Sequence, residues 1–345
     1  MEGMEGRGTA VLRVVVAVLV LASFGTAVAV GRSQVKPAVA VAPPVARATT
    51  TSSTVPTTTT AAPAAPAPPP ALAEPAKAVV SPSGVVLPVI AAEAGAWRVR
   101  TPCGNETTIS EARPLSQADV VIDPGHGGVE PGSVSDEHGL AEKEVNLGVS
   151  RELQRALELQ GISAVLTRYS DHRVPLTARS AVAKAMQPRA FVSIHHNAEP
   201  DGPYDGPGAE TYYQHRDPQS KRLAGLILEE LRATFAILPV TWVGDSDAGA
   251  KARVNSRGDD YYGILRHTNG IPGVLSEAAF VSNPDEAKLM KTVEFQRLEA
   301  DAIARAITRF FTTKDPGSGF VDGYPRQSPA GSGGGSKSCT DPALS

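Results

Sequence analysis

This chain of 345 residues has only two cysteines and no excess of basic residues. Its two cysteines, Cys103 and Cys339, stand in no CxxC spacing, so a cysteine zinc site is not expected. The formal net charge of −3 provides no basic field, so nucleic acid is not predicted as a partner. In an exported protein the two cysteines can pair as a disulfide. The residues alone leave open whether they do, because Cys339 lies in a glycine- and serine-rich tail.

Aromatic residues are absent from residues 33–76, which consist mainly of alanine, proline, threonine and valine and include ten prolines. Such a composition buries too little apolar surface to offset the entropy of ordering. Its prolines favour an extended chain. We therefore predict a disordered linker over residues 33–77.

A run of eighteen uncharged residues, residues 14–31, follows Arg7 and Arg13. This pattern is typical of a secretion signal or a membrane anchor. The run is close to the shortest length that spans a bilayer, and it contains an A-x-A-like pattern ending at Ala29, so cleavage and retention both stay open. We assign residues 1–32 to a signal peptide or membrane anchor. The rest is expected in the periplasm or cell wall, secreted or tethered to the outer face of the cytoplasmic membrane.

The remaining chain divides by pattern into three parts. Short β-rich runs broken by glycine and proline predict a small β-rich element over residues 78–117. Residues 118–313 alternate strand-like and helical runs, which predicts a single α/β domain whose mostly parallel twisted sheet is covered by helices on both faces. Residues 314–345 are predicted to be a flexible tail. The expected strands are 119–123, 163–168, 190–195, 209–214 and 273–280, and the expected helices are 144–160, 176–186, 218–235 and a final pair from residue 285.

Three of the apolar runs end in side chains that bind metals or move protons. "VVIDPGHGG" ends near His126, "AFVSIHHNA" contains His195 and His196, and "GVLSEAAF" contains Glu277. Ligands of such sheets lie beyond the carboxyl ends of the strands, so one edge is expected to collect these residues. Only one of the two adjacent histidines can face that edge easily, because successive strand residues point to opposite faces. Taken alone, His126 is also typical of a hydrogen-bonded turn residue, and Glu277 of a structural salt bridge.

Glu142 is a candidate third metal ligand. "LAEKEVNL" places it where a helix begins, and glycines at positions 127, 128, 132 and 139 allow the preceding loop to fold back. Two histidines and one glutamate suit a catalytic zinc site with a position left for water. A carboxylate near that water can take its proton, which would be the role of Glu277. For Glu142 the alternative is that it only complements the helix dipole.

Five ordered segments resemble one family. "VVIDPGHGG", "LAEKEVNL", "LTRYSDHRVPLTAR", "FVSIHHNA" and "VLSEAAFVSNPDEAKLM" are similar in order and spacing to the zinc-dependent N-acetylmuramoyl-L-alanine amidases, called amidase type 3. The resemblance covers about residues 118–313. It implies that Zn²⁺ is held by His126, Glu142 and His195, that Glu277 is catalytic, and that His196 occupies a variable position. The implied reaction is hydrolysis, by zinc-activated water, of the amide joining N-acetylmuramic acid to the L-alanine of the peptidoglycan stem peptide.

The chain departs from the family pattern at two places. Ala279 stands where the family usually has glycine, and the segment between the first two motifs is slightly long and carries His138 as an alternative ligand. In some relatives an inserted helix occludes the zinc. Here residues 244–263 have the composition of a glycine-rich, charged loop, which predicts an open site; whether a protein activator is needed stays unknown.

Two further polar residues have open roles. Asp123 either orients a ligand histidine or caps the loop backbone. Arg179 either forms a structural ion pair or contacts substrate. Asn197 and Asn283 are expected to hold loops or bind peptide. The remaining histidines are expected to be at the surface or structural: His138, His172, His215 and His267.

Two rival functions remain for the same fold. One is a zinc carboxypeptidase acting on stem peptides, and the other is a non-catalytic wall-binding regulator. A regulator would be expected to have lost Glu277 or a zinc ligand, and all four residues are present. The sequence therefore favours a hydrolase.

Overall fold

The computed structural model describes residues 75–323 and 339–345. The predicted signal or anchor and nearly all of the predicted linker lie outside these residues. Within the described part of the chain, no helix has both the length and the apolar character needed to cross a bilayer.

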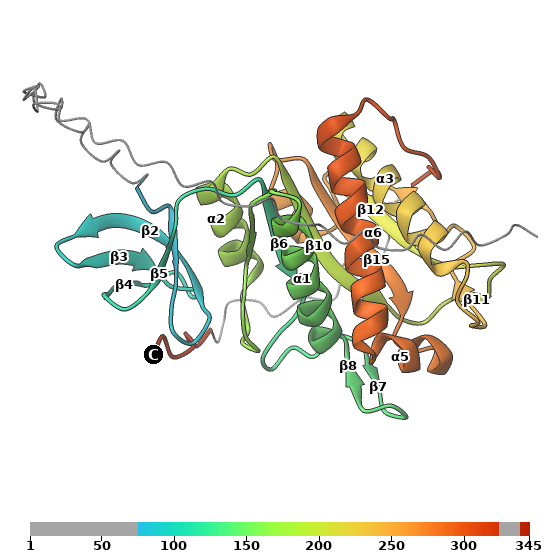
Figure 1. Ribbon diagram of the computed structural model, residues 1–345, viewed down its shortest axis with the longest axis horizontal. Coiled ribbons are helices and arrows are strands. Elements are labelled where there is room, and N and C mark those ends of the chain that lie inside the picture. Colours follow the sequence, from blue (N-terminus) through green and yellow to red (C-terminus); the bar gives the residue numbers. More distant parts are fainter. Residues whose placement is uncertain (1–74, 324–338) are drawn as a thin grey trace, which may run out of the picture. The chain divides into compact units, whose positions relative to one another are not determined.

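A six-stranded sheet forms the centre of the fold (Figure 1). Neighbouring strands are parallel except that β12 runs antiparallel to β15. The predicted mostly parallel sheet is therefore confirmed. Because β14 is parallel to β12, these two strands run opposite to the other four. The connection from β10 to β12 contains no helix, whereas a return to the same direction needs a crossover, and this explains the reversal at β12. In spatial order the strands are β14 (Ala250–Lys251), β12 (Glu210–Tyr213), β15 (Gly273–Phe280), β10 (Ala190–Asn197), β6 (Val120–Pro124) and β9 (Ala164–Leu166).

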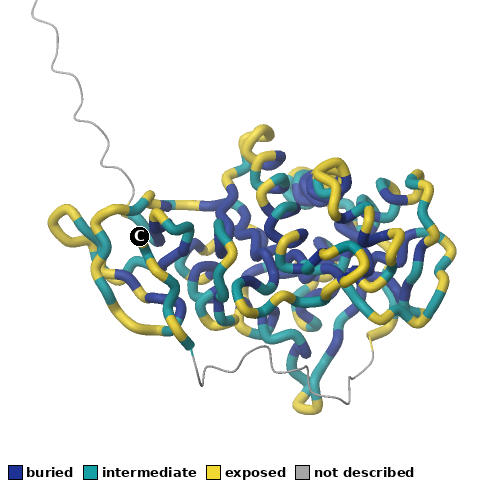
Figure 2. The backbone as a smooth tube through the Cα atoms, turned by 90° about the horizontal axis from the view of Figure 1, so that it is seen from below, coloured by how far each residue is buried: buried dark blue, intermediate teal, exposed yellow. Residues whose placement is uncertain are grey.

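Helices cover both faces of this sheet, as predicted. Alternate strand residues show it: Val120 and Ile122 pack in one apolar cluster with α1, α3 and α6, whereas Val121 packs in another with α2 and α4. Buried backbone accordingly runs through the sheet and its covering helices, and exposed backbone follows the loops (Figure 2). The helices are α1 (Glu142–Leu159), α2 (Leu176–Met186), α3 (Pro218–Phe235), α4 (Gly263–His267), α5 (Pro284–Met290) and α6 (Val293–Thr312).

Helix α1 begins two residues before its predicted start, at Glu142. Its buried stripe contains the four apolar residues that the sequence places at four-residue spacing, Val145, Val149, Leu153 and Leu157. One short hairpin and one further antiparallel strand pair were not foreseen from the sequence. They are β7 (Val134–Ser135) with β8 (Leu140–Ala141), and β11 (Gly202–Pro203) with β13 (Val243–Gly244). The hairpin folds the chain back to the start of α1.

A second sheet of five antiparallel strands precedes the α/β domain. The order is β4, β3, β2, β1, β5, with bounds β1 (Ala78–Val80), β2 (Val86–Glu93), β3 (Ala96–Arg100), β4 (Glu106–Ile109) and β5 (Arg113–Leu115). Its small core includes Val79, Leu87 and Val99, all buried, with Leu344 from the C-terminus packed against them.

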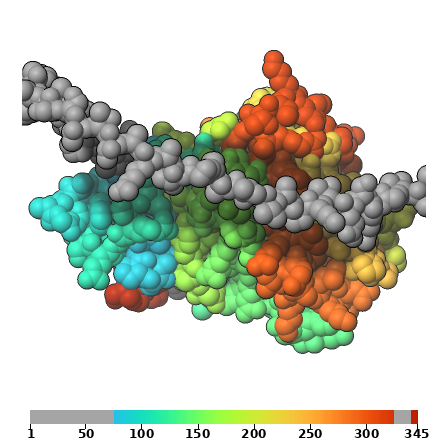
Figure 3. Space-filling model, viewed as in Figure 1, coloured from blue at the N-terminus to red at the C-terminus, as the bar shows by residue number. Residues whose placement is uncertain are grey.

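The prediction of a flexible tail is wrong for residues 314–323 and 339–345. The backbone N–H of Ala250 donates to Gly319, and Phe320 packs on the main core. Cys339 forms a disulfide with Cys103, and the Asp341 carboxylate accepts hydrogen bonds from Thr101, Asn105 and the Cys103 backbone. In Figure 3 the red C-terminal residues lie against the blue and cyan residues near the start of the described chain. Composition indicates flexibility only on average, and it does not foresee such specific anchors.

We expect loss of this disulfide to lower the free energy of unfolding. It joins residues 236 positions apart, and closing so long a loop restricts the unfolded chain, which stabilises a fold by about 2–4 kcal/mol. The double variant Cys103→Ser/Cys339→Ser should therefore unfold at lower denaturant concentration than the oxidised protein. Reductant should shift the wild type to the same midpoint and leave the variant unchanged. Equal midpoints for oxidised and reduced wild type would contradict the prediction.

Candidate metal centre

Three neighbouring parallel strands bring the predicted site residues to one edge. Strand β10 lies between β6 and β15, and His195 stands beside Glu277 in the register of the pair. His126 follows the end of β6 in the turn after Pro124. The geometric prediction that different strands deliver these residues to one edge is confirmed.

Two buried arginines donate hydrogen bonds to the backbone of the turn that carries His126. His126 has a φ of 58°, in the left-handed region. Its carbonyl accepts from Arg179 Nη2 at 2.6 Å, and the carbonyl of Gly125 accepts from Arg168 Nη2 at 2.9 Å. The His126 ring extends toward Glu142, with Nε2 3.2 Å from Oε1. The His126 side chain therefore interacts with Glu142, whereas the alternative considered from the sequence was a turn histidine hydrogen-bonded to backbone.

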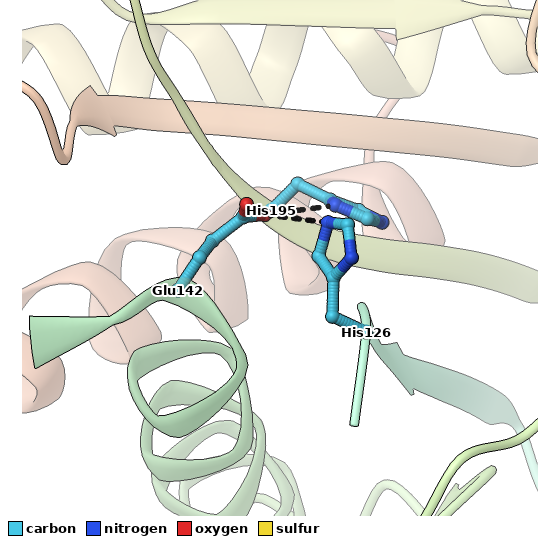
Figure 4. A group of neighbouring side chains, drawn as sticks. All are labelled: His126, Glu142 and His195. Carbon is cyan, nitrogen blue, oxygen red and sulfur yellow. Dashed lines mark hydrogen bonds and ion pairs between the residues drawn. The ribbon is translucent and has the colours of Figure 1, made fainter. Parts of the chain in front are cut away.

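The Glu142 carboxylate contacts both histidines (Figure 4). Glu142 is the first residue of α1, and its Oε1 is also 3.0 Å from His195 Nδ1. Its Oε2 accepts from the backbone N–H of Ser133 at 2.9 Å. The loop folds back as expected, because the backbone N–H of Glu142 in turn donates to the Ser133 carbonyl. Glu142 thus complements the helix dipole and also joins the cluster.

The cluster of His126, Glu142 and His195 has the donors and spacing of a metal site. One ligand atom from each residue lies within 4.8 Å of the others. Two ligands bound to one zinc ion at about 2.1 Å in tetrahedral geometry lie about 3.4 Å apart. The two nitrogen–oxygen distances here, 3.2 and 3.0 Å, are close to that value. The residues present therefore fit a divalent metal held by two imidazoles and a carboxylate.

The protonation states also suit metal binding, which requires a neutral imidazole and an ionised carboxylate. Burial lowers the pKa of His195. Burial alone would raise the pKa of Glu142, but hydrogen bonds from His126 and His195 bring it well below its usual value.

Glu277 faces the same site. It lines a pocket of about 300 Å³ together with the three cluster residues. Its Oε2 is buried and has no hydrogen-bond partner among the described residues. Burial, with the nearby charges of Glu142 and Glu210, raises its pKa well above the usual range. A carboxyl group with one unpaired oxygen at a pocket is available to exchange a proton with a bound molecule.

The two roles considered for Asp123 are both wrong. Among the described residues its carboxylate forms no hydrogen bond with a ligand histidine or a loop N–H; instead it accepts from Arg179, Thr167 and Ser193, all buried. Burial would raise its pKa, but the Arg179 guanidinium lowers it overall. The structural ion pair considered for Arg179 is confirmed, since its Nη1 lies 2.9 Å from Asp123 Oδ1. Asp123 therefore supports the His126 turn through Arg179.

His196 points away from the site, into the core between β10, α1 and α6, where only 2% of it is exposed.

Of the other histidines, His138 lies in the turn between β7 and β8 and is not part of the cluster. Asn283 caps α5, and Asn197 donates to Glu210. Ala279 is buried in β15.

A second acidic group lies next to Glu277 and was missed from the sequence. Glu210 stands opposite Glu277 in the β12–β15 pair and approaches Asp245 and Asp247. The buried Lys251 ammonium pairs with Glu210 and Asp247, so this group already holds a cation. Sequence periodicity does not predict this acidic group. Its partner Lys251 lies in the charged stretch after residue 244, which has no helical or strand pattern. That stretch contains no α-helix before Gly263.

Gly125 leaves room for the His195 ring. A Cβ at this position would lie 2.3 Å from His195 Cε1. We expect Gly125→Ala to displace the ring, weaken binding of a divalent metal and cost about 1–3 kcal/mol of stability, the usual effect of overpacking. Calorimetric Zn²⁺ titration and thermal unfolding check this. Gly202→Ala, where a Cβ meets nothing within 4 Å, is the control and should leave both unchanged. Unaltered Zn²⁺ affinity in Gly125→Ala would contradict the prediction.

Comparison with known proteins places the chain in a family. The profile described as N-acetylmuramoyl-L-alanine amidase (Amidase_3) matches residues 120–309. The chain is 34% identical over 221 residues to the uncharacterized protein YqiI of Bacillus subtilis, covering 62% of this chain and 97% of that protein. It is 29% identical to the N-acetylmuramoyl-L-alanine amidase AmiC of Neisseria meningitidis, covering 56% of this chain and 53% of that one.

Among solved structures, Cwp6 from Clostridium difficile aligns with a TM-score of 0.51 and 29% identity, over 58% of this chain and 32% of that chain. The chain thus spans about half the length of the Neisseria relative and a third of Cwp6. The family match covers more than half of this chain and includes all four predicted site residues. This chain therefore belongs to the N-acetylmuramoyl-L-alanine amidase family.

Proposed function

We propose that this protein hydrolyses peptidoglycan at the amide bond between N-acetylmuramic acid and the L-alanine of the stem peptide, with Zn²⁺ held by His126, Glu142 and His195. One observation carries the proposal. In a chain of the amidase family, these three donors converge at the pocket that Glu277 also lines.

The metal and the protein divide the chemistry. Zn²⁺ in this position supplies a Lewis acid that polarises the scissile carbonyl and lowers the pKa of water. The two histidines and Glu142 would hold the ion at the pocket that Glu277 also lines.

Glu277 performs the proton transfers. Its carboxylate removes a proton from the attacking water and hands it to the amine that leaves as the N-terminus of L-alanine. The environment that raises its pKa favours the protonated form needed for the second transfer. One carboxyl group therefore serves both steps.

We place the enzyme outside the cytoplasm, where peptidoglycan lies. The apolar run at residues 14–31 and the Cys103–Cys339 disulfide support this, because disulfides persist in oxidising compartments. Whether residues 1–32 are removed or kept as an anchor would follow from the N-terminal sequence of the mature protein.

Mass spectrometry of fragments released from purified peptidoglycan tests the function. The full chain should release stem peptides that begin at L-alanine, and a chelator should stop the release until Zn²⁺ is added back. Release of single C-terminal amino acids would identify a carboxypeptidase instead. Intact stems, with Zn²⁺ bound, would favour a wall-binding regulator.

A further inference from the structure

Glu299 is a carboxylate inside the core that the proposed chemistry does not use. It lies on α6 with 0% of its surface exposed. Its Oε2 is 3.0 Å from His196 Nε2, and its Oε1 has no hydrogen-bond partner among the described residues. A carboxyl group is costly to bury in this way unless the contacts it makes have a role.

From Glu299 a chain of hydrogen bonds leads to the metal cluster. His196 Nδ1 lies 2.8 Å from Asn146 Oδ1. Asn146 Nδ2 donates to Glu142 Oε1 at 3.2 Å and to the Gly125 carbonyl at 3.3 Å. The chain crosses from α6 through β10 to α1, and Asn146 is fully buried. No water is needed at any step.

The direction of these bonds depends on which end of the Asn146 amide faces Glu142. The amide has one accepting and one donating end. If it turned over, its oxygen would face the Glu142 carboxylate and the Gly125 carbonyl, which both accept. A proton on His196 Nδ1 prevents this by donating to Oδ1. In this arrangement the His196–Glu299 pair holds two protons, one on Nδ1 and one between Nε2 and Glu299 Oε2, 3.0 Å apart; a single proton, on Nε2, would leave Nδ1 an acceptor.

We infer that Glu299 is a positioning residue for the metal centre. Through His196 it fixes the Asn146 amide, and the amide holds Glu142 Oε1 toward His126 and His195. Partners behind metal ligands act in this way on ligand orientation. The inference rests on the proposed metal site, and Glu299 itself touches neither metal nor substrate.

Two substitutions of Glu299 in the full chain separate positioning from packing. Glu299→Leu is expected to weaken Zn²⁺ affinity about 10–100-fold, the usual cost of losing such a partner. Glu299→Gln should restore most of that affinity, because its amide can donate to His196 Nε2 and leave the proton on Nδ1. Ile303→Val, one turn further along α6 and equally buried, is the packing control and should bind Zn²⁺ like the wild type. Competition with a chromophoric chelator measures the affinities.

A second measurement uses the metal-free protein. Long-range ¹H–¹⁵N spectra of histidine-labelled protein, with His196→Gln identifying the signal, should show a protonated Nδ1 on His196 in the wild type and in Glu299→Gln. In Glu299→Leu this preference should be lost.

The outcomes distinguish the two proposals. Unchanged Zn²⁺ affinity in Glu299→Leu, or an unprotonated Nδ1 in the wild type, would overturn the role of Glu299. The wild-type spectrum decides even if the leucine variant fails to fold. Failure of the wild type to bind Zn²⁺, with Nδ1 protonated as expected, would contradict the metal centre instead and leave the orientation of Asn146 by His196 established.

Discussion

Glu277→Gln is expected to slow peptidoglycan hydrolysis by about 10²–10⁴-fold, the contribution of a positioned general acid–base group. The amide keeps the shape of the side chain but accepts no proton from water. Because Glu277 lies beside the three proposed ligands and is not one of them, Zn²⁺ content should stay at the wild-type value. Release of stem peptides and metal analysis of the same sample measure both.

The control for this variant is Glu158→Gln, an exposed glutamate near the end of α1. It should hydrolyse peptidoglycan at the wild-type rate. Undiminished turnover in Glu277→Gln with unchanged Zn²⁺ content would remove Glu277 from the mechanism. Loss of Zn²⁺ in that variant would show that Glu277 is itself a ligand.

His126→Ala is expected to lose both Zn²⁺ and hydrolysis. The variant lacks one of the three protein ligands. Its Zn²⁺ affinity should therefore fall by more than the factor of about 10–100 that follows from removing a residue hydrogen-bonded to a ligand. The side chains of Arg168 and Arg179 still donate to the backbone carbonyls of the turn, so the fold should persist. Metal content after gel filtration, with circular dichroism of the same sample, checks the prediction.

An exposed histidine provides the comparison. His267→Ala lies away from the cluster and should retain full Zn²⁺ content and activity. Full Zn²⁺ content in His126→Ala would show that the ion binds elsewhere. Together, the glutamate and histidine variants separate the loss of proton transfer from the loss of the metal.

Much of the fold was predictable because its signals are local. The bounds of α2, α3 and β15 agree with the predicted ones. Asp217 caps α3 with its side chain and Pro218 follows at the first helical position, a strong start signal in any sequence. The reversed strand β12 could not be foreseen, because its partner β15 lies more than sixty residues further along the chain.

The site divides in the same way. Strand alternation predicts that only one of His195 and His196 faces the edge, but the choice depends on which sheet face carries α1 and α6. The sequence did not decide whether Glu142 is a metal ligand or only complements the helix dipole, because only the folded loop brings it to His126. The contacts of Glu299 and Lys251 with their partners join residues 103 and 41 positions apart, with no periodic signal to announce them.

A crystal of the Zn²⁺-loaded protein, measured at the zinc absorption edge, tests the central claim most directly. The account predicts one strong anomalous peak, bound by His126, Glu142 and His195, at the pocket that Glu277 lines. No peak at these residues, or a peak at Glu210, Asp245 and Asp247 instead, would contradict it.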